Sequence, residues 1–313
     1  MPRDPARPDL YARVTDAIIA DLEAGVRPWV QPWTSGLSGG SVRRPLRANG
    51  EPYSGVNVLL LWSEALARGF AAPMWMTFRQ ALELGAHVRK GARGATVVYA
   101  SRFRRTQADG HGGDVDKWIP FLKAYTVFNV DEIEDLPAAF RPEPPAPPPT
   151  ERRIVAAQAF FDALGADIRY GGGQAYYALD RDYVQVPPEA AFPDIDDFYA
   201  TLAHECVHWT RHPTRLARDF GRKRWGDEGY AREELVAELG AAFLCADLGL
   251  ELTPRRDHAD YICDWLQVLR NDKRFVFQAA AFAQKACDFL HGLQPPSAAA
   301  GADVLATESA PGA

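Results

Sequence analysis

Hydrophobic residues recur every three or four positions along several stretches of this 313-residue chain. This spacing is typical of helices that pack one face against a core. It predicts helices at residues 8–24, 55–69, 77–84, 152–163, 195–211, 230–247, 258–269 and 272–290. Alternating apolar positions predict a β-hairpin within residues 171–187 and a strand at residues 95–99. Residues 104–117 are rich in glycine and polar residues, so we expect a mobile hairpin loop there.

Proline content divides the chain into two parts. Residues 141–150 read RPEPPAPPPT, which predicts a stiff, extended linker rather than a packed segment. A hydrophobic content of 47% over this length is enough for about two domains with real cores. We therefore predict an N-terminal domain at residues 1–140 and a separable C-terminal domain at residues 151–293. Residues 294–313 lack periodicity and are expected to form a disordered tail.

The clearest chemical signal is the pattern H-E-x-x-H on the predicted helix at residues 195–211. His204 and His208 are four residues apart, so their imidazoles lie on one helical face and can bind one divalent ion. Glu205 is placed to take a proton from a water molecule at that ion, as in zinc-dependent hydrolases. The alternative is an exposed helix with two histidines. Phe198 and Leu202 argue against it, because they continue the apolar spacing of a core-facing helix.

A catalytic zinc site needs a third protein ligand and leaves a fourth position for water. His212 is nearest along the chain, but Pro213 directly after it ends the helix, which disfavours it. The predicted helix at residues 230–247 carries Glu234 and Glu238 on one face. We predict that Glu234 is the third ligand and that Glu238 orients a ligating histidine. The alternative is that both glutamates are solvated surface charges.

Charge is unevenly distributed along the chain. The formal net charge is −6, yet residues 40–105 contain eleven Lys and Arg against three Asp and Glu. Residues 151–313 contain seventeen basic and twenty-five acidic side chains, a net charge of −8. This asymmetry predicts a polyanionic partner for the N-terminal half only.

Aromatic residues interleave with the basic ones in the N-terminal half, a combination typical of proteins that bind single-stranded nucleic acid. The candidate contacts are Trp29, Trp33, Arg47, Tyr53, Trp75, Arg89, Lys90 and Arg93. The last three belong to a predicted basic turn, whose glycines let a phosphate approach the backbone. The alternative for Trp29 and Trp33 is that they anchor a loop against the core.

Longer strings in both halves resemble a known family. Residues 204–220 (HECVHWTRHPTRLARDF) and 230–244 (YAREELVAELGAAFL) resemble the metallopeptidase domain of ArdC-type antirestriction proteins, which are plasmid- and phage-borne. Residues 47–50 (RANG) and 88–94 (VRKGARG) resemble the N-terminal domain that these proteins share with TraC-like plasmid primases. The resemblance covers nearly all of residues 8–290.

The resemblance implies an α+β protein of two domains. The first is an α/β domain that binds single-stranded DNA, and the second is a zincin-like metallopeptidase domain of the gluzincin type with Glu234 as the third ligand. The implied function is antirestriction, the protection of incoming plasmid or phage DNA. The alternative is a zinc metallopeptidase that cleaves a host protein and is only localised by its N-terminal domain. Zn²⁺ is the expected cofactor, although Mn²⁺ or Co²⁺ also suits a His/His/Glu site.

The expected partners are single-stranded DNA and a protein or peptide substrate. A membrane partner is not expected, because the chain contains no apolar stretch of eighteen residues. With no signal-peptide pattern at its start, the sequence predicts a cytoplasmic protein. The cysteines fit that compartment as single, buried, reduced thiols in predicted helices: Cys206, Cys245, Cys263 and Cys287.

Overall fold

The computed structural model describes residues 9–29, 43–108, 114–140, 150–221, 227–250 and 259–296. The helices in these ranges are α1 (Leu10–Glu23), α2 (Val56–Arg68), α3 (Phe78–Glu83), α4 (Thr150–Asp162), α5 (Ile195–Trp209), α6 (Glu228–Leu248), α7 (Ala259–Asn271) and α8 (Phe275–Gly292). The strands are β1 (Leu46–Arg47), β2 (Met74–Met76), β3 (His87–Val88), β4 (Ala95–Ala108), β5 (Asp114–Asn129), β6 (Ile133–Glu134), β7 (Asp167–Tyr170), β8 (Tyr176–Ala178) and β9 (Tyr183–Val186). Every predicted helix is present with shifted ends, and the α+β class is confirmed.

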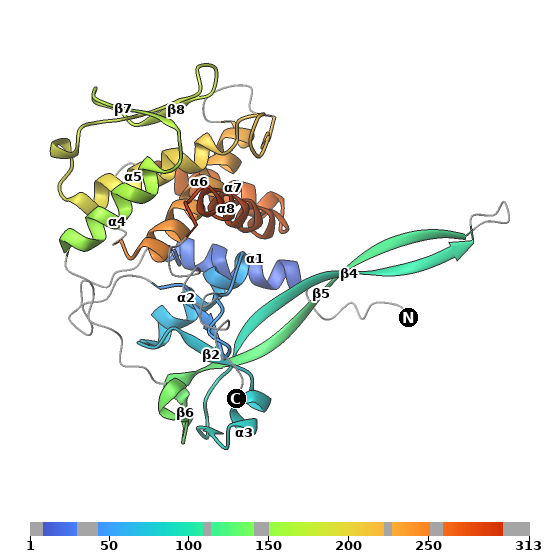
Figure 1. The fold of residues 1–313 in the computed structure, drawn as a ribbon. Coiled ribbons are helices and arrows are strands. Elements are labelled where there is room, and N and C mark those ends of the chain that lie inside the picture. Colours follow the sequence, from blue (N-terminus) through green and yellow to red (C-terminus); the bar gives the residue numbers. More distant parts are fainter. Residues whose placement is uncertain are drawn as a thin grey trace, which may run out of the picture.

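Helices α4 to α8 and one small sheet form the C-terminal part of the molecule (Figure 1). The sheet has the strand order β7-β9-β8, with β7 parallel and β8 antiparallel to β9. Its strands β8 and β9 pack against α5, the helix that carries H-E-x-x-H. The hairpin predicted within residues 171–187 is therefore confirmed, and β8 is an edge strand beside that helix.

The N-terminal part has a four-stranded sheet in the order β1-β2-β5-β4 and a two-stranded sheet of β3 and β6. Strands β4 and β5 form a long ribbon that extends away from the body (Figure 1). A hairpin loop over all of residues 104–117 is wrong, because residues 104–108 and 114–117 pair as strands in that ribbon. Residues 109–113 lie outside the described residues. The glycine-rich run there is short, and regular cross-strand pairing continues up to it on both sides.

Both halves of the chain contribute to one continuous hydrophobic core. Trp62 on α2 packs edge-on against Phe243 on α6, with ring centroids 5.9 Å apart. Trp29 packs in the same way against Trp265 on α7, again at 5.9 Å. Arg44, 6% exposed, forms two hydrogen bonds to the Asp247 carboxylate at 3.0 and 2.9 Å. These contacts argue against separable modules, because separating the halves would expose buried rings and leave a buried ion pair unmatched.

Local sequence explains how α5 and α6 come to lie so close together. The Asp194 side chain caps α5 by accepting a hydrogen bond from the Asp197 amide at 2.8 Å, and Asp227 caps α6 in the same way. At their crossing, a Cβ atom added to Gly240 would lie 2.7 Å from a methyl group of Val207. The absence of a side chain at Gly240 therefore sets the distance between the two helices.

Some sequence-based expectations fall outside the described residues. Residues 141–149 of the predicted linker lie outside the described residues, and its last residue, Thr150, is the first residue of α4. Most of the predicted tail, residues 297–313, is also outside. Within the ranges that the structure does describe, no helix is both long and apolar enough to cross a membrane. Three of the four cysteines are buried as predicted, but Cys263 is exposed.

Candidate metal centre

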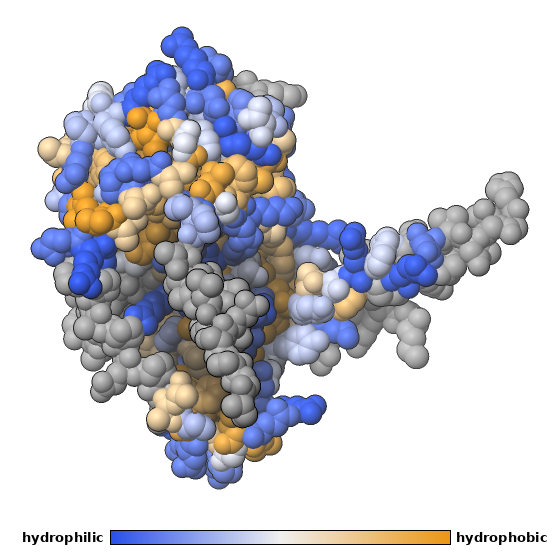
Figure 2. Space-filling view, in the orientation of Figure 1, coloured by the Kyte–Doolittle hydropathy of each residue, from blue (hydrophilic) through white to orange (hydrophobic). Residues whose placement is uncertain are grey.

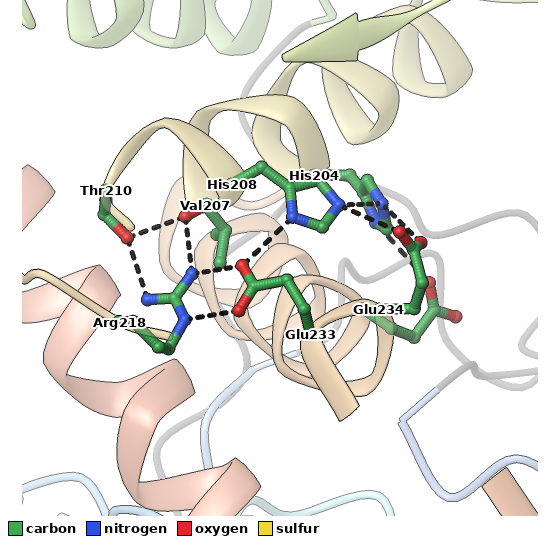
Figure 3. Close-up of polar contacts among 8 residues, drawn as sticks. His204, Val207, His208, Thr210, Arg218, Glu233 and Glu234 are labelled. Carbon is green, nitrogen blue, oxygen red and sulfur yellow. Dashed lines mark hydrogen bonds and ion pairs between the residues drawn. The ribbon is translucent and has the colours of Figure 1, made fainter. Parts of the chain in front are cut away.

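His204, His208 and Glu234 converge on one point between α5 and α6 (Figure 3). One ligand atom from each lies within 4.8 Å of the others, and all three residues are buried. The Nε2 atoms of the two histidines are 3.1 Å apart. The Glu234 carboxylate lies 3.5 Å from each of these nitrogens. The predicted pair on α5 and the predicted third residue on α6 are thus brought together as expected.

The second nitrogen of His208 is held by Glu233, which sequence reasoning did not single out. Its Oε1 atom lies 3.1 Å from His208 Nδ1. Neighbouring residues on a helix point about 100° apart, so Glu233 and Glu234 reach different atoms of the site. A carboxylate on the remote ring nitrogen fixes the tautomer and ring orientation of a ligating histidine. The signal that was missed is the paired Glu233-Glu234 at the start of α6.

Arg218 holds Glu233 in turn (Figure 3). Its guanidinium donates to both carboxylate oxygens at 2.8 and 2.7 Å, and its side chain is 1% exposed. It also donates to the Val207 carbonyl at 3.0 Å and to the Thr210 hydroxyl at 3.1 Å. The guanidinium therefore ties the loop after α5 to both helices and neutralises a buried carboxylate. The sequence does not distinguish Arg218 from an arginine on the surface, and only the structure shows that its side chain is buried.

The titration behaviour of the site reflects its excess of carboxylates. Burial lowers the pKa of His208, but the Glu234 charge and hydrogen bonds to Glu233 and Glu234 outweigh it and raise the pKa to about 10. Burial raises the pKa of Glu234, but the two histidines hold it well below its usual range. Burial likewise raises the pKa of Glu233, and Arg218 and His208 more than offset that effect. The buried carboxylates of α6 therefore stabilise positive charge at the facing histidine of α5.

Glu238 connects the candidate ligand His204 to the N-terminal part of the chain. Its Oε2 atom lies 3.9 Å from His204 Nδ1, on the side of the ring away from Glu234. Its Oε1 atom accepts a hydrogen bond from the Trp29 indole at 3.2 Å and lies 4.0 Å from the Arg27 guanidinium. At 3.9 Å this contact is too long for a hydrogen bond, so the orienting role of Glu238 stays a prediction. The sequence does not predict that Arg27 and Trp29, which follow α1, contact the Glu238 carboxylate.

Glu205 lies one residue after His204 on α5 and is 4% exposed. Among the residues that the structure describes, no hydrogen bond or ion pair engages its carboxylate, and no fourth His, Cys, Asp or Glu joins the ligand group. A His/His/Glu set with a position left over is the donor set of a catalytic rather than a structural zinc site. The residues therefore fit a divalent metal.

The remaining candidate ligand is His212, which lies beyond the end of α5 with its Nδ1 atom 2.7 Å from the Thr214 hydroxyl. It is not part of the ligand group. Arg215 in the same loop binds Asp182 at the β8–β9 turn, where its Nη1 atom donates to Oδ2 at 3.0 Å. Its Nη2 atom also donates to the Tyr177 hydroxyl at 3.1 Å. The loop that follows α5 thus contacts edge strand β8 and the β8–β9 turn.

The structure divides the candidate DNA contacts into buried and exposed residues. Trp29 and Trp75 are each 1% exposed and Tyr53 is 8% exposed, so they cannot offer a ring face to a base. Their selection as stacking residues is corrected, because all three pack in the core. The exposed candidates are Arg47, Arg89, Lys90 and Arg93, and Trp33 lies outside the described residues. The predicted basic turn is therefore on the surface, between β3 and β4.

Comparison with known protein families agrees with this arrangement. Residues 8–128 match the N-terminal domain of the anti-restriction factor ArdC, and residues 155–282 match the zincin-like metallopeptidases. An uncharacterized protein of Sinorhizobium fredii, y4eC, is 44% identical over 298 residues, which are 93% of this chain and 95% of that protein. The DNA primase TraC of Escherichia coli is 36% identical over 297 residues, or 90% of this chain, but the match spans only 27% of the primase.

Two solved structures are also similar. The metal-free crystal structure of the antirestriction protein ArdC from the R388 plasmid has a TM-score of 0.77 and 44% sequence identity, covering 92% of this chain and 98% of ArdC. Its Mn(II)-bound form has a TM-score of 0.75 and 42% identity, covering 93% and 100%. The protein thus combines an ArdC-type N-terminal domain with a zincin-like metallopeptidase domain that implies a divalent metal. It belongs to the ArdC family of antirestriction proteins.

Proposed function

We propose that this protein binds single-stranded DNA through its N-terminal half, protects incoming plasmid or phage DNA from restriction, and carries a zinc-dependent peptidase site. The convergence of His204, His208 and Glu234 around one point supports the metal site. The exposed basic turn at residues 89–93, in a half of the chain with excess positive charge, supports the binding of a polyanion. Membership of the ArdC family supports the antirestriction role.

The residues of the site have separate tasks in this proposal. His204, His208 and Glu234 would hold the metal, which when bound polarises a carbonyl group and acidifies water. Glu205 accepts a proton from the attacking water and delivers it to the leaving amine. Glu233 keeps the His208 ring in the orientation that presents Nε2 to the metal.

The peptide substrate in this proposal lies along β8. This strand is at the edge of its sheet, it packs beside α5, and its Tyr176 side chain is 42% exposed. An extended peptide can add to such an edge through main-chain hydrogen bonds. That arrangement would place its backbone near the helix that carries Glu205.

The test of DNA binding uses the full chain, because both halves share a core. Fluorescence anisotropy with labelled single- and double-stranded oligonucleotides across a salt series is expected to show tight, salt-sensitive binding to single strands. Equal or absent binding to both would overturn the single-strand proposal.

The test of hydrolysis uses Glu205→Gln, which keeps the size of the side chain and removes its basicity. We expect this variant to bind metal like the wild type and to lose all cleavage of candidate protein substrates. If the wild type cleaves and the variant cleaves equally well, Glu205 is not the base. If the wild type binds no DNA yet cleaves protein, the alternative function, a metallopeptidase that its N-terminal half only localises, is the correct one.

A further inference from the structure

Strands β4 and β5 pair with each other over their whole length and form an arm. The arm is anchored at its inner end, where β2 pairs with Phe128 and Asn129 of β5. The Asn57 side chain also accepts from the Val98 amide at 2.7 Å and donates to the Val98 carbonyl at 2.9 Å. Beyond these contacts the two strands extend away from the body (Figures 1 and 2). A two-stranded ribbon is marginally stable alone, so its exposed side chains are expected to serve a partner.

One face of the arm carries a cluster of aromatic rings. Cross-strand register pairs Val97 with Tyr125, Tyr99 with Lys123 and Ser101 with Phe121, and paired side chains lie on the same face of a ribbon. The ring centroid of Tyr99 is 6.2 Å from that of Phe121 and 6.5 Å from that of Tyr125. The arm aromatic face is defined here as Tyr99, Phe121, Lys123 and Tyr125.

These rings are on the surface rather than in the core. Tyr99 is 53% exposed and Tyr125 is 47% exposed. Lys123 lies on the same face, with its ammonium nitrogen 5.4 Å from the Phe121 ring centroid. Exposed tyrosines beside a lysine offer stacking surfaces for bases and a charge for a phosphate.

The other face repeats this combination of ring and cation. Trp118 is 53% exposed, and the guanidinium of Arg102 lies 5.0 Å from its ring centroid. At its base, the arm continues directly from the basic turn, because Arg93 is two residues before the first residue of β4. Gly94 lies against Thr126 and Phe128 of β5, so the turn is held close to the arm. Positive charge therefore runs from the turn onto the arm.

We propose that the arm aromatic face is the stacking platform for single-stranded DNA, with phosphates bound by Lys123 and by the basic turn. Only unpaired bases can present their faces to these rings, because duplex bases are already stacked on one another. This inference rests on the proposed single-stranded DNA binding and names the residues that carry it. The rings of the arm replace the buried Trp29 and Trp75 as the aromatic component.

The test measures binding of a labelled oligothymidylate to the full-length protein by anisotropy over a salt series. Tyr99→Leu/Tyr125→Leu removes the rings and keeps apolar bulk, whereas Tyr99→Phe/Tyr125→Phe keeps the rings. The matched control is Tyr170→Leu on β7, where a tyrosine is similarly exposed, at 51%, but lies in the metallopeptidase domain. We expect the double leucine variant to raise Kd by about tenfold or more for each ring, and the other two variants to stay within about twofold.

Salt dependence separates stacking from charge. The double leucine variant should keep the wild-type slope of log Kd against log salt, because it removes no cation. Neutralising Arg89, Lys90 and Arg93 together should reduce that slope by about 2, since each phosphate contact on a single strand contributes about 0.7.

The outcomes distinguish this inference from the proposed function. If the wild type binds no single-stranded DNA, both fall. If it binds and the double leucine variant binds equally well, the arm inference falls alone. If light scattering shows that the double leucine variant changes oligomeric state while DNA affinity is retained, the face binds a second copy of the chain and the inference is overturned.

Discussion

The pair formed by Arg218 and Glu233 provides a quantitative test of how the metal centre is supported. Replacing Arg218 with Met removes a guanidinium that is 1% exposed and donates to both Glu233 oxygens. The Glu233 carboxylate, itself 3% exposed, then stays buried without its main cation. Removing one partner of a buried ion pair costs about 3–5 kcal/mol, because the remaining charge is uncompensated. We expect the free energy of unfolding of Arg218→Met to fall by that amount.

The assay is urea denaturation in the presence of a chelator, so that metal binding does not contribute. The double variant Arg218→Met/Glu233→Met should recover most of the lost stability, because an apolar pair of similar volume replaces a buried ion pair at little or no cost. The control Arg79→Met breaks an exposed i,i+4 pair with Glu83 and should change stability by about 0.5 kcal/mol or less. If Arg218→Met loses less than about 1 kcal/mol of unfolding free energy, or the double variant recovers none of it, the Arg218–Glu233 ion pair does not stabilise the site as described.

Three other predictions concern the metal and the helices that hold it. Trp29→Phe removes the N–H that binds Glu238 and should weaken metal affinity, measured by calorimetry, about 10–100-fold. The control Trp62→Phe loses an indole hydrogen bond to the Arg43 carbonyl and should leave metal affinity unchanged. Equal affinities of the two variants would show that Trp29 does not support the metal site. Gly240→Ala should lower the free energy of unfolding by about 1–3 kcal/mol, because the new methyl group overlaps the Val207 side chain on α5. An unchanged free energy of unfolding would show that the two helices can move apart without cost. The pKa of His208 is raised to about 10, so metal binding must displace a proton from this side chain. The apparent affinity for the metal should therefore rise by up to about tenfold per pH unit below pH 10. A metal affinity that does not change with pH would contradict this.

The same shift has a consequence for the metal-free protein. The folded pKa of His208, about 10, lies above its ordinary value of 6.5. Protonation of the folded state therefore contributes stability that is fully present below pH 6.5 and is lost as pH rises toward 10. The metal replaces that proton, so the holoprotein should not show the loss.

The sequence predicted those features of the site that depend on spacing within one helix. The placement of His204 and His208 on one face of α5 follows from their i,i+4 spacing. Glu233 and Arg218 were missed because their roles depend on burial and on contacts between separate segments. No local pattern distinguishes a buried arginine from a surface one.

The aromatic residues show the same limit. Trp29 and Trp75 stand among basic residues, a pattern that predicts stacking on bases. A tryptophan in a basic segment can equally fill the core, and both do. The arm was underestimated for a different reason. Its glycine-rich stretch gave a strong loop signal, while the strands on either side carry polar and charged residues that a free ribbon tolerates on both faces.

Anomalous diffraction from crystals of the full chain, grown with Zn²⁺ and separately with Mn²⁺, would show directly whether His204, His208 and Glu234 bind a metal. We expect one anomalous peak, about 2.0–2.2 Å from the nearest nitrogens of His204 and His208 and from a Glu234 oxygen, with Glu205 left uncoordinated. A peak held by four protein ligands, or none at this position, would contradict a catalytic metal centre between α5 and α6.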